Sequence, residues 1–127
     1  MKTRVITSAI IQRSDKFLIV KRAPDQEFAP SLWEFVIGFL DEGETADDTV
    51  LREVQEEIGC KGKILKKLPV YEIEDNEANW VVIPFVIQVD NEASIRLSHE
   101  HTDFAWVSRS DLNNYPELAE DVEIMRL

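Results

Sequence analysis

The stretch from Gly38 to Cys60, GFLDEGETADDTVLREVQEEIGC, constrains the fold of this chain more than any other part. Its 23 residues include eight acidic side chains and a single arginine. Thr45 is a typical helix N-cap with Asp48 as its capping-box partner, and Gly59 is a typical residue at which a helix stops. We therefore predict a helix from about Ala46 to Ile58.

The acidic residues of this predicted helix lie where a helix tolerates them least. At about 100° per residue, Glu53, Glu56 and Glu57 fall on one side, away from the apolar residues. Their i,i+3 and i,i+4 spacings bring like charges together, and the last turn disfavours a carboxylate by about 0.3–1 kcal/mol. Because a hard divalent cation takes oxygen ligands, three converging carboxylates predict a site for Mg²⁺.

The spacing of the acidic residues also matches a known signature. It consists of Gly38, five residues, Glu44, seven residues, and then Arg52-Glu53-Val54-Gln55-Glu56-Glu57-Ile58-Gly59-Cys60. In this pattern the chain resembles the Nudix hydrolase family. Further segments resemble its MutT-type branch, namely Leu18–Arg22, Leu32–Phe35, and Glu100 with Trp106.

This resemblance implies a fold and an activity. The fold would be of the α/β class, a mixed β-sheet sandwiched between α-helices (α/β/α), with residues 1–127 forming a single Nudix hydrolase domain. Such proteins cleave a pyrophosphate bond in a nucleoside diphosphate linked to another group, using Mg²⁺ or Mn²⁺. We therefore expect a metal-dependent pyrophosphohydrolase, acting on a (deoxy)nucleoside triphosphate to give the monophosphate and pyrophosphate.

Roles for the acidic residues also follow from the resemblance. Glu53, Glu56 and Glu57 would be metal ligands and catalytic residues, and the backbone carbonyl of Gly38 would add another ligand. Glu53 serves as the base in some members of the family. In others the base is a glutamate of a later loop, whose position here is that of Glu100, and we count Glu100 among the catalytic and metal-binding residues.

Other residues are expected around this centre. By the resemblance, Glu44 and Arg52 would form a structural ion pair that fixes the loop on the helix. Arg22 ends a β-rich run near the expected phosphate region and would contact a phosphate or ribose, or else be a surface charge. Trp33, Phe35 and Trp80 offer faces on which a base can stack, with core packing as the alternative.

Some positions give weaker functional evidence or depart from the family pattern. His99 and His101 flank Glu100, and a histidine pair without cysteine is more typical of the surface. The usual Pro-Gly-Gly before the signature is Val36-Ile37-Gly38 here, and the lysine that often follows is Phe39. Because Ala119 matches the place of the base-reading asparagine of 8-oxo-dGTP hydrolases, the resemblance does not extend to that specificity.

The rest of the chain is mostly β in pattern. Strands are predicted at Val5–Ile11, Phe17–Val20, Trp33–Ile37, Ile64–Ile73, Trp80–Val89 and Phe104–Val107. Pro84 interrupts one of them, which indicates a bulge or an edge. An amphipathic helix is predicted from Pro116 to Met125. Many strands around one long helix indicate an α/β or α+β layer arrangement with a mixed sheet.

The amino-acid composition narrows the classes of partner that this protein can bind. The net charge of −11 disfavours a nucleic acid polymer, because such binding depends on clustered Lys and Arg, while a metal still permits a small phosphorylated ligand. The single cysteine suits a reducing compartment, and the apolar run near the start is too short for a membrane span or signal peptide. We expect a cytoplasmic monomer or homodimer with a small nucleotide substrate and no membrane partner.

Two other functions stay open. One is the hydrolysis of dinucleoside polyphosphates or nucleotide sugars. The other is a non-catalytic nucleotide-binding domain, which is disfavoured because such domains typically lose a glutamate of the signature and all are present here.

Overall fold

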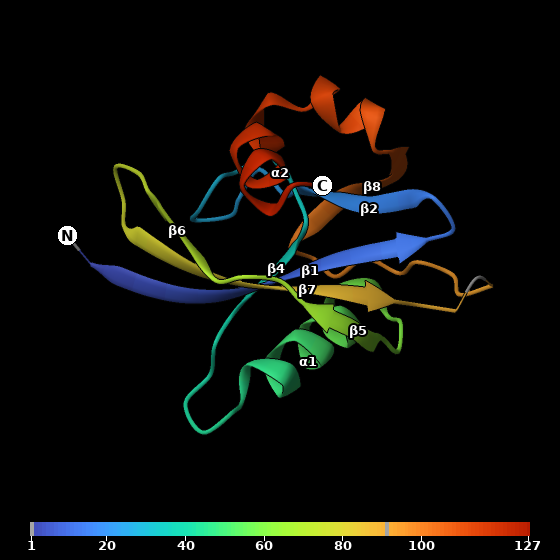
Figure 1. Cartoon of the computed structure of the whole chain (residues 1–127), viewed down its shortest axis with the longest axis horizontal. Coiled ribbons are helices and arrows are strands. Elements are labelled where there is room, and N and C mark those ends of the chain that lie inside the picture. Colours follow the sequence, from blue (N-terminus) through green and yellow to red (C-terminus); the bar gives the residue numbers. More distant parts are fainter. Residues whose placement is uncertain (1, 91) are drawn as a thin grey trace.

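The computed structural model describes residues 2–90 and 92–127, which form a mixed sheet of eight strands with helices on both faces (Figure 1). The strands are β1 (Thr3–Arg13), β2 (Lys16–Arg22), β3 (Trp33–Glu34), β4 (Val36–Phe39), β5 (Lys63–Lys67), β6 (Tyr71–Glu74), β7 (Asn79–Gln88) and β8 (His101–Ser108). The helices are α1 (Ala46–Ile58) and α2 (Ala119–Met125), with 3₁₀ helices at Ser110–Asn114 and Pro116–Leu118. None of the described helices is long and apolar enough to cross a membrane.

Strand β1 lies at the centre of the sheet and has three neighbours. It pairs in parallel with β7 from Thr3 to Gln12. On its other side it pairs antiparallel with β4 over Ile6–Ala9, and only its end, Gln12 and Arg13, pairs with β2. Strand β2 continues into pairs with β3 and β8. The two groups of strands therefore separate along one edge of β1.

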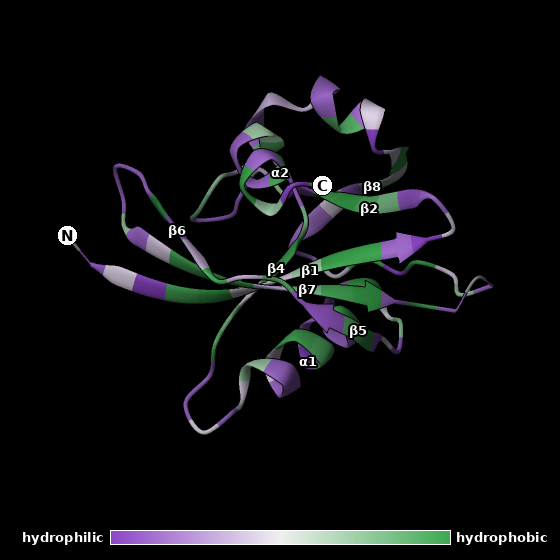
Figure 2. Cartoon of the chain, viewed as in Figure 1, coloured by the Kyte–Doolittle hydropathy of each residue, from purple (hydrophilic) through white to green (hydrophobic). Residues whose placement is uncertain are grey.

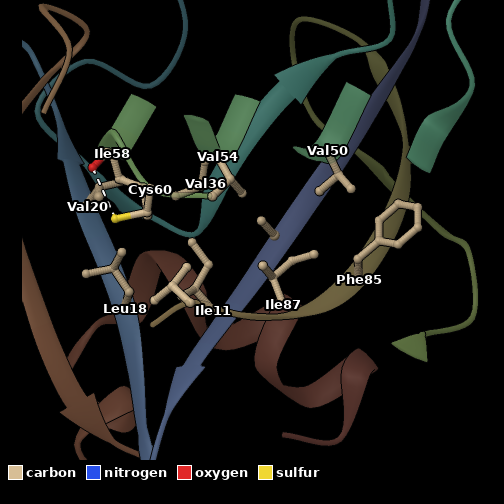
Figure 3. Close-up of a cluster of buried hydrophobic side chains, with 12 residues drawn as sticks. Ile11, Leu18, Val20, Val36, Val50, Val54, Ile58, Cys60, Phe85 and Ile87 are labelled. Carbon is tan, nitrogen blue, oxygen red and sulfur yellow. Dashed lines mark hydrogen bonds between the residues drawn. The ribbon is translucent and has the colours of Figure 1, made fainter. Parts of the chain in front are cut away.

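Helix α1 begins and ends at the residues predicted from the sequence. The Thr45 side chain accepts a hydrogen bond from the Asp48 N–H at 3.1 Å, and Gly59 adopts the left-handed conformation with φ of 69°. Val50, Val54 and Ile58 face the sheet and are fully buried. Figure 3 shows these side chains above residues of β1, β2 and β7, with Cys60 in the same cluster.

Side chains alternate across β1 and divide the interior into two clusters. Ala9 and Ile11 belong to the cluster under α1, whereas Ile10 belongs to the cluster under the C-terminal helices. Figure 2 shows that the hydrophobic segments concentrate in the central strands and on the sheet-facing part of α1. The predicted sandwich, a mixed sheet between helices, is confirmed.

The prediction of one strand over Ile64–Ile73 was wrong, because this segment forms β5 and β6, which both pair with β7. Between them, the Leu68 N–H donates to the carbonyl of Pro84 at 3.0 Å. The backbone nitrogen and carbonyl oxygen of a strand residue point to the same side of the strand. The backbone nitrogen of Pro84, which carries no hydrogen, therefore faces the gap between β5 and β6. For this reason Pro84 fits in a continuous central strand, without the bulge or edge position predicted for it.

Candidate active site

The three glutamates predicted as metal ligands converge on one side of α1. One carboxylate oxygen from each of Glu53, Glu56 and Glu57 lies within 4.8 Å of the others. Their exposure differs, since the side chain of Glu56 is 54% exposed and those of Glu53 and Glu57 are 13% and 6% exposed. Three oxygen donors this close together form a donor set that fits Mg²⁺ or Mn²⁺.

Gly38 in β4 lies directly against Glu53. A Cβ atom at position 38 would be 2.1 Å from Cγ of Glu53 and 2.4 Å from its Cδ, so only glycine leaves room for this side chain. The Gly38 carbonyl accepts a long hydrogen bond, 3.5 Å, from the hydroxyl of Thr7. The last strand before the loop therefore determines where the Glu53 carboxylate lies.

Glu53 has an unusual protonation equilibrium. Burial raises the pKa of Glu53 to about 7, an effect that neighbouring Glu57 and Glu56 reinforce and Arg52 opposes. In the metal-free protein this carboxyl group therefore exchanges a proton near neutral pH, and a cation bound to it would lower its pKa.

Arg52 joins the loop before α1 to the acidic side of the helix. Its Nε and Nη2 atoms donate to the two carboxylate oxygens of Glu44 at 2.9 and 2.8 Å, and the hydroxyl of Thr49 adds a hydrogen bond to Glu44 at 3.0 Å. Nη1 of Arg52 reaches Glu53 at 2.9 Å and Glu56 at 3.1 Å. The structure thus contains the predicted ion pair between Glu44 and Arg52. It also shows Arg52 in contact with two glutamates of the acidic cluster.

Glu57 is the most buried of the three glutamates and is held from the opposite side. The hydroxyl of Ser98 donates to its carboxylate at 2.9 Å, and the Ser98 N–H donates to its backbone carbonyl at 3.1 Å. Burial favours the neutral acid, but the neighbouring His101, Glu100 and Ser98 side chains outweigh it and lower the pKa of Glu57. Glu57 is therefore a carboxylate at neutral pH.

His101 lies in the interior, so its prediction as a surface residue was wrong. Its side chain is 1% exposed and lies between two carboxylates, with Nδ1 3.0 Å from Glu57 and Nε2 2.9 Å from Glu34. Burial opposes the charged form, but contact with Glu34 and Glu57 raises the pKa of His101 to about 9. His101 is therefore an imidazolium at neutral pH, and it compensates two buried negative charges. His99 is exposed, as predicted.

Glu100 lies beside Glu57 and not within the three-carboxylate cluster. Its N–H donates to the Ser98 hydroxyl at 3.2 Å, and its carbonyl accepts from the Ala23 N–H at 2.8 Å. Burial and a hydrogen bond with Glu57 raise the pKa of Glu100. Together with Gly38 and Glu53, it lines a cleft of about 830 Å³, a volume typical of small-molecule sites.

Comparison with known proteins identifies this arrangement. A sequence model described as the NUDIX domain matches residues 2–127. The chain belongs to the NUDIX family. It is accordingly a hydrolase of pyrophosphate bonds and a nucleotide pyrophosphohydrolase.

Relatives of this NUDIX protein resemble it over most of its length. The nucleoside triphosphatase NudI of Escherichia fergusonii is 29% identical in an alignment 126 positions long. This alignment covers 91% of this chain and 89% of the relative. Among solved structures, the MutT protein from Methanosarcina mazei has a TM-score of 0.81 at 24% identity, with 89% of this chain and 82% of that one covered. A C. elegans Ap4A hydrolase has a TM-score of 0.81 at 21% identity, with 97% and 93% covered. Both structures show the shared fold.

The residues predicted to contact substrate have different positions in the NUDIX cleft. Arg22 lines it, but its guanidinium is already bound to Glu34 at 3.1 Å and to the Phe28 carbonyl at 2.7 Å. Trp33 also lines the cleft and packs edge-to-face on Tyr115. Phe35 is 2% exposed and belongs to the core cluster under α2, so it packs there and offers a base no free face.

Two aromatic residues that sequence analysis did not assign to substrate, Phe28 and Phe39, line the same cleft together with Trp80. Their ring centroids lie 5.3 to 6.2 Å apart. Phe39 is 43% exposed and directly follows Gly38 in the position where the family often has lysine. The apolar residue at that position was the available signal for Phe39, whereas Phe28 joins the two others only through the fold.

A Gly38→Ala variant is expected to lose about 10- to 100-fold in affinity for Mn²⁺, because the added methyl group must displace the Glu53 side chain. Isothermal titration of Mn²⁺ measures this loss. Gly43→Ala is the contrasting variant, since a Cβ there meets no atom within 4 Å but φ is +84°. It should lower the melting temperature and leave metal affinity unchanged. Equal metal affinity in both variants would contradict the role of Gly38.

Proposed function

We propose that this protein is a metal-dependent pyrophosphohydrolase of nucleoside triphosphates that releases a nucleoside monophosphate and pyrophosphate. The observation that carries the proposal is the convergence of Glu53, Glu56 and Glu57 within 4.8 Å at the side of a nucleotide-sized cleft. The nucleoside triphosphatases named NudI, which align with about nine-tenths of the chain, support the choice of substrate.

The donor set determines which residues would hold the metal. The carboxylates of Glu53, Glu56 and Glu57 would be the ligands, with the carbonyl of Gly38 as a further oxygen donor. A bound Mg²⁺ or Mn²⁺ would supply charge neutralisation to the phosphate oxygens and lower the pKa of a bound water. Glu100 lies outside this set and beside Glu57, and we assign it a supporting role.

The remaining chemistry belongs to the side chains. Glu53 would accept the proton of the attacking water, since it belongs to the three-carboxylate cluster and also lines the cleft. Glu57 stays ionised because the imidazolium of His101 lies 3.0 Å away. Arg52 balances the charge of Glu53 and Glu56 until substrate is bound.

The proposal is tested by product analysis. Nucleoside and deoxynucleoside triphosphates, a dinucleoside tetraphosphate and a nucleotide sugar are each incubated with the protein and Mg²⁺. We expect equimolar monophosphate and pyrophosphate from triphosphates, no orthophosphate, and no reaction in EDTA. Faster cleavage of the dinucleoside tetraphosphate or nucleotide sugar would favour that alternative, and orthophosphate release would contradict the proposed bond cleavage.

Metal binding is also expected to stabilise the fold. An ion that binds only the native state adds about 2.7 kcal/mol to the free energy of unfolding at 100 times its Kd. Millimolar Mn²⁺ should therefore raise the melting temperature more than NaCl at equal ionic strength, which only screens charge. Glu56→Gln is the matched variant, because Glu56 is 54% exposed and its loss spares the metal-free fold. An equal response to both salts would contradict a specific site.

A further inference from the structure

Strands β5 and β6 form an open edge of the sheet. Both pair antiparallel with β7, and they follow one another along it (Figure 1). Among the residues that the structure describes, no strand pairs with the outer side of either one. Edge strands present unpaired N–H and C=O groups, which proteins usually cover or guard with charge. This edge therefore has backbone groups available to a further strand.

The charges on this edge are separated along its length. Four of the seven lysines of the chain lie between positions 61 and 67, and all four are exposed. The next strand, β6, carries the exposed acids Glu72 and Glu74. Pairing of β5 with β5 of another copy would place like charges opposite one another, which is destabilising. The charge of β5 therefore favours an acidic partner strand.

The junction between the two strands is apolar and exposed. Val70 is 57% exposed, the highest value among the large hydrophobic residues that the structure describes, and Leu65 follows with 49%. Pro69 beside Val70 is also exposed. Protein interfaces typically have an apolar centre and a polar rim. Lysines on one side of Val70 and glutamates on the other give this edge the same arrangement.

A two-fold axis through this junction brings the basic and acidic strands together. Because β5 and β6 both run antiparallel to β7, they run in the same direction as each other. Rotation about a two-fold axis normal to the sheet at Val70 reverses that direction in a second copy. The basic β5 of each copy then lies antiparallel to the acidic β6 of the other. Such an interface uses the same patch on both copies, as in most protein dimers.

The backbone directions indicate which residues of the two strands lie opposite each other. The Pro84 carbonyl accepts from the Leu68 N–H, so the even-numbered residues of β7 point their backbone groups to this edge. Lys67 and Glu72 are both opposite odd-numbered residues of β7. Their N–H and C=O groups therefore point outward, where they can pair with the strand of a second copy.

The side chains of Lys67 and Glu72 also share a face of the sheet. Lys67 is opposite Phe85, which belongs to the cluster under α1, and its Nζ lies 2.7 Å from Asp47 of that helix. Glu72 is opposite Val81, four residues from Phe85 on β7, so it faces the same side. An ammonium has three N–H donors, so the pair with Asp47 leaves donors for a second carboxylate. Lys67 therefore matches Glu72 of a second copy in both backbone and charge.

We propose that this protein forms a homodimer through the β5–β6 edge, with Lys67 opposite Glu72 of the partner subunit and Val70 at the two-fold axis. The sheets of the two copies then form one continuous sheet. The inference goes beyond the proposed function and does not depend on it, since none of these three residues lines the cleft.

The charge pairing is tested by sedimentation velocity of the intact protein over a range of concentrations. Lys67→Glu should raise the Kd of the dimer about tenfold or more, because by symmetry it makes two attractive pairs repulsive. Glu72→Lys should do the same. The double variant restores opposite charges and should recover most of the affinity. Lys16→Glu is the control, since Lys16 is exposed on β2, across β1 from β7, and should leave the Kd unchanged.

The axis is tested by Val70→Asp, which places two like charges next to each other in the dimer. The variant should be a monomer at concentrations at which the protein is a dimer. Its circular dichroism spectrum should be unchanged, because the side chain is exposed in a single copy.

Three results would overturn the inference. One is a protein that stays monomeric at the highest concentration reached, in which case the lysines only guard an edge. Another is a dimer whose Kd is the same in Lys67→Glu and Val70→Asp, which would place the interface elsewhere. The third is weakening in both single charge variants without recovery in the double variant, which would show that Lys67 and Glu72 are not partners.

Discussion

A Glu53→Gln variant is expected to lose about two orders of magnitude or more in kcat while remaining folded. The substitution removes a charged ligand oxygen and the group proposed to accept the proton of the attacking water. It also removes a carboxylate that is buried against Glu56 and Glu57, so the metal-free protein should be no less stable. Steady-state pyrophosphate release at saturating Mg²⁺ measures the rate, and thermal unfolding measures the fold.

Two further variants make this result specific. Glu42→Gln changes an exposed acid of the adjoining loop by the same atoms and should leave kcat unchanged. Glu100→Gln changes the acid that is hydrogen-bonded to Glu57 and should cost less than Glu53→Gln. If Glu100→Gln is the more damaging of the two, the base is Glu100 and our assignment is reversed.

A His101→Gln variant is expected to lower the free energy of unfolding by about 3–5 kcal/mol, because it removes one partner of a buried ion pair. Without the imidazolium, Glu34 and Glu57 face each other across an uncharged side chain. Denaturant unfolding of the metal-free protein measures the change. His99→Gln, an exposed neighbour, should have no effect on stability.

The loss in His101→Gln should also depend on pH. The pKa of His101 is about 9 in the folded protein and about 6.5 in an unfolded chain. Because the folded value is raised, the stabilisation is fully present below pH 6.5 and is lost as the pH rises through about 9. The difference between the protein and the variant should therefore be largest near pH 6 and shrink by pH 10. A difference that is independent of pH would show that His101 acts by packing alone.

Features encoded by neighbouring residues were predictable from the sequence. The bounds of α1 follow from Thr45 and Gly59, which act within one turn of the helix. The convergence of the three glutamates follows from helical spacing. The fold followed from the family resemblance, whose signature is local, and the NUDIX match confirms it.

Features that depend on pairing between distant segments were not predictable. His101 is charged because the fold brings Glu34 and Glu57 to its two ring nitrogens, and no local pattern marks these partners. The division between β5 and β6 depends on how Pro84 faces them from another strand. Phe35 was open to a stacking role because an aromatic residue in a strand has the same local pattern on either face of a sheet.

Alternation along β1 affects how this protein can be re-engineered. Residues 6 and 8 line the cleft, whereas Thr7 bonds to the Gly38 carbonyl and residues 9 and 11 belong to the cluster under α1. Substitutions at residues 6 and 8 can therefore alter the lining of the cleft without altering the packing that anchors α1. A one-residue slip of the strand would exchange the two sets and disrupt both. We therefore expect single substitutions that reshape the cleft to be tolerated more readily than insertions within β1.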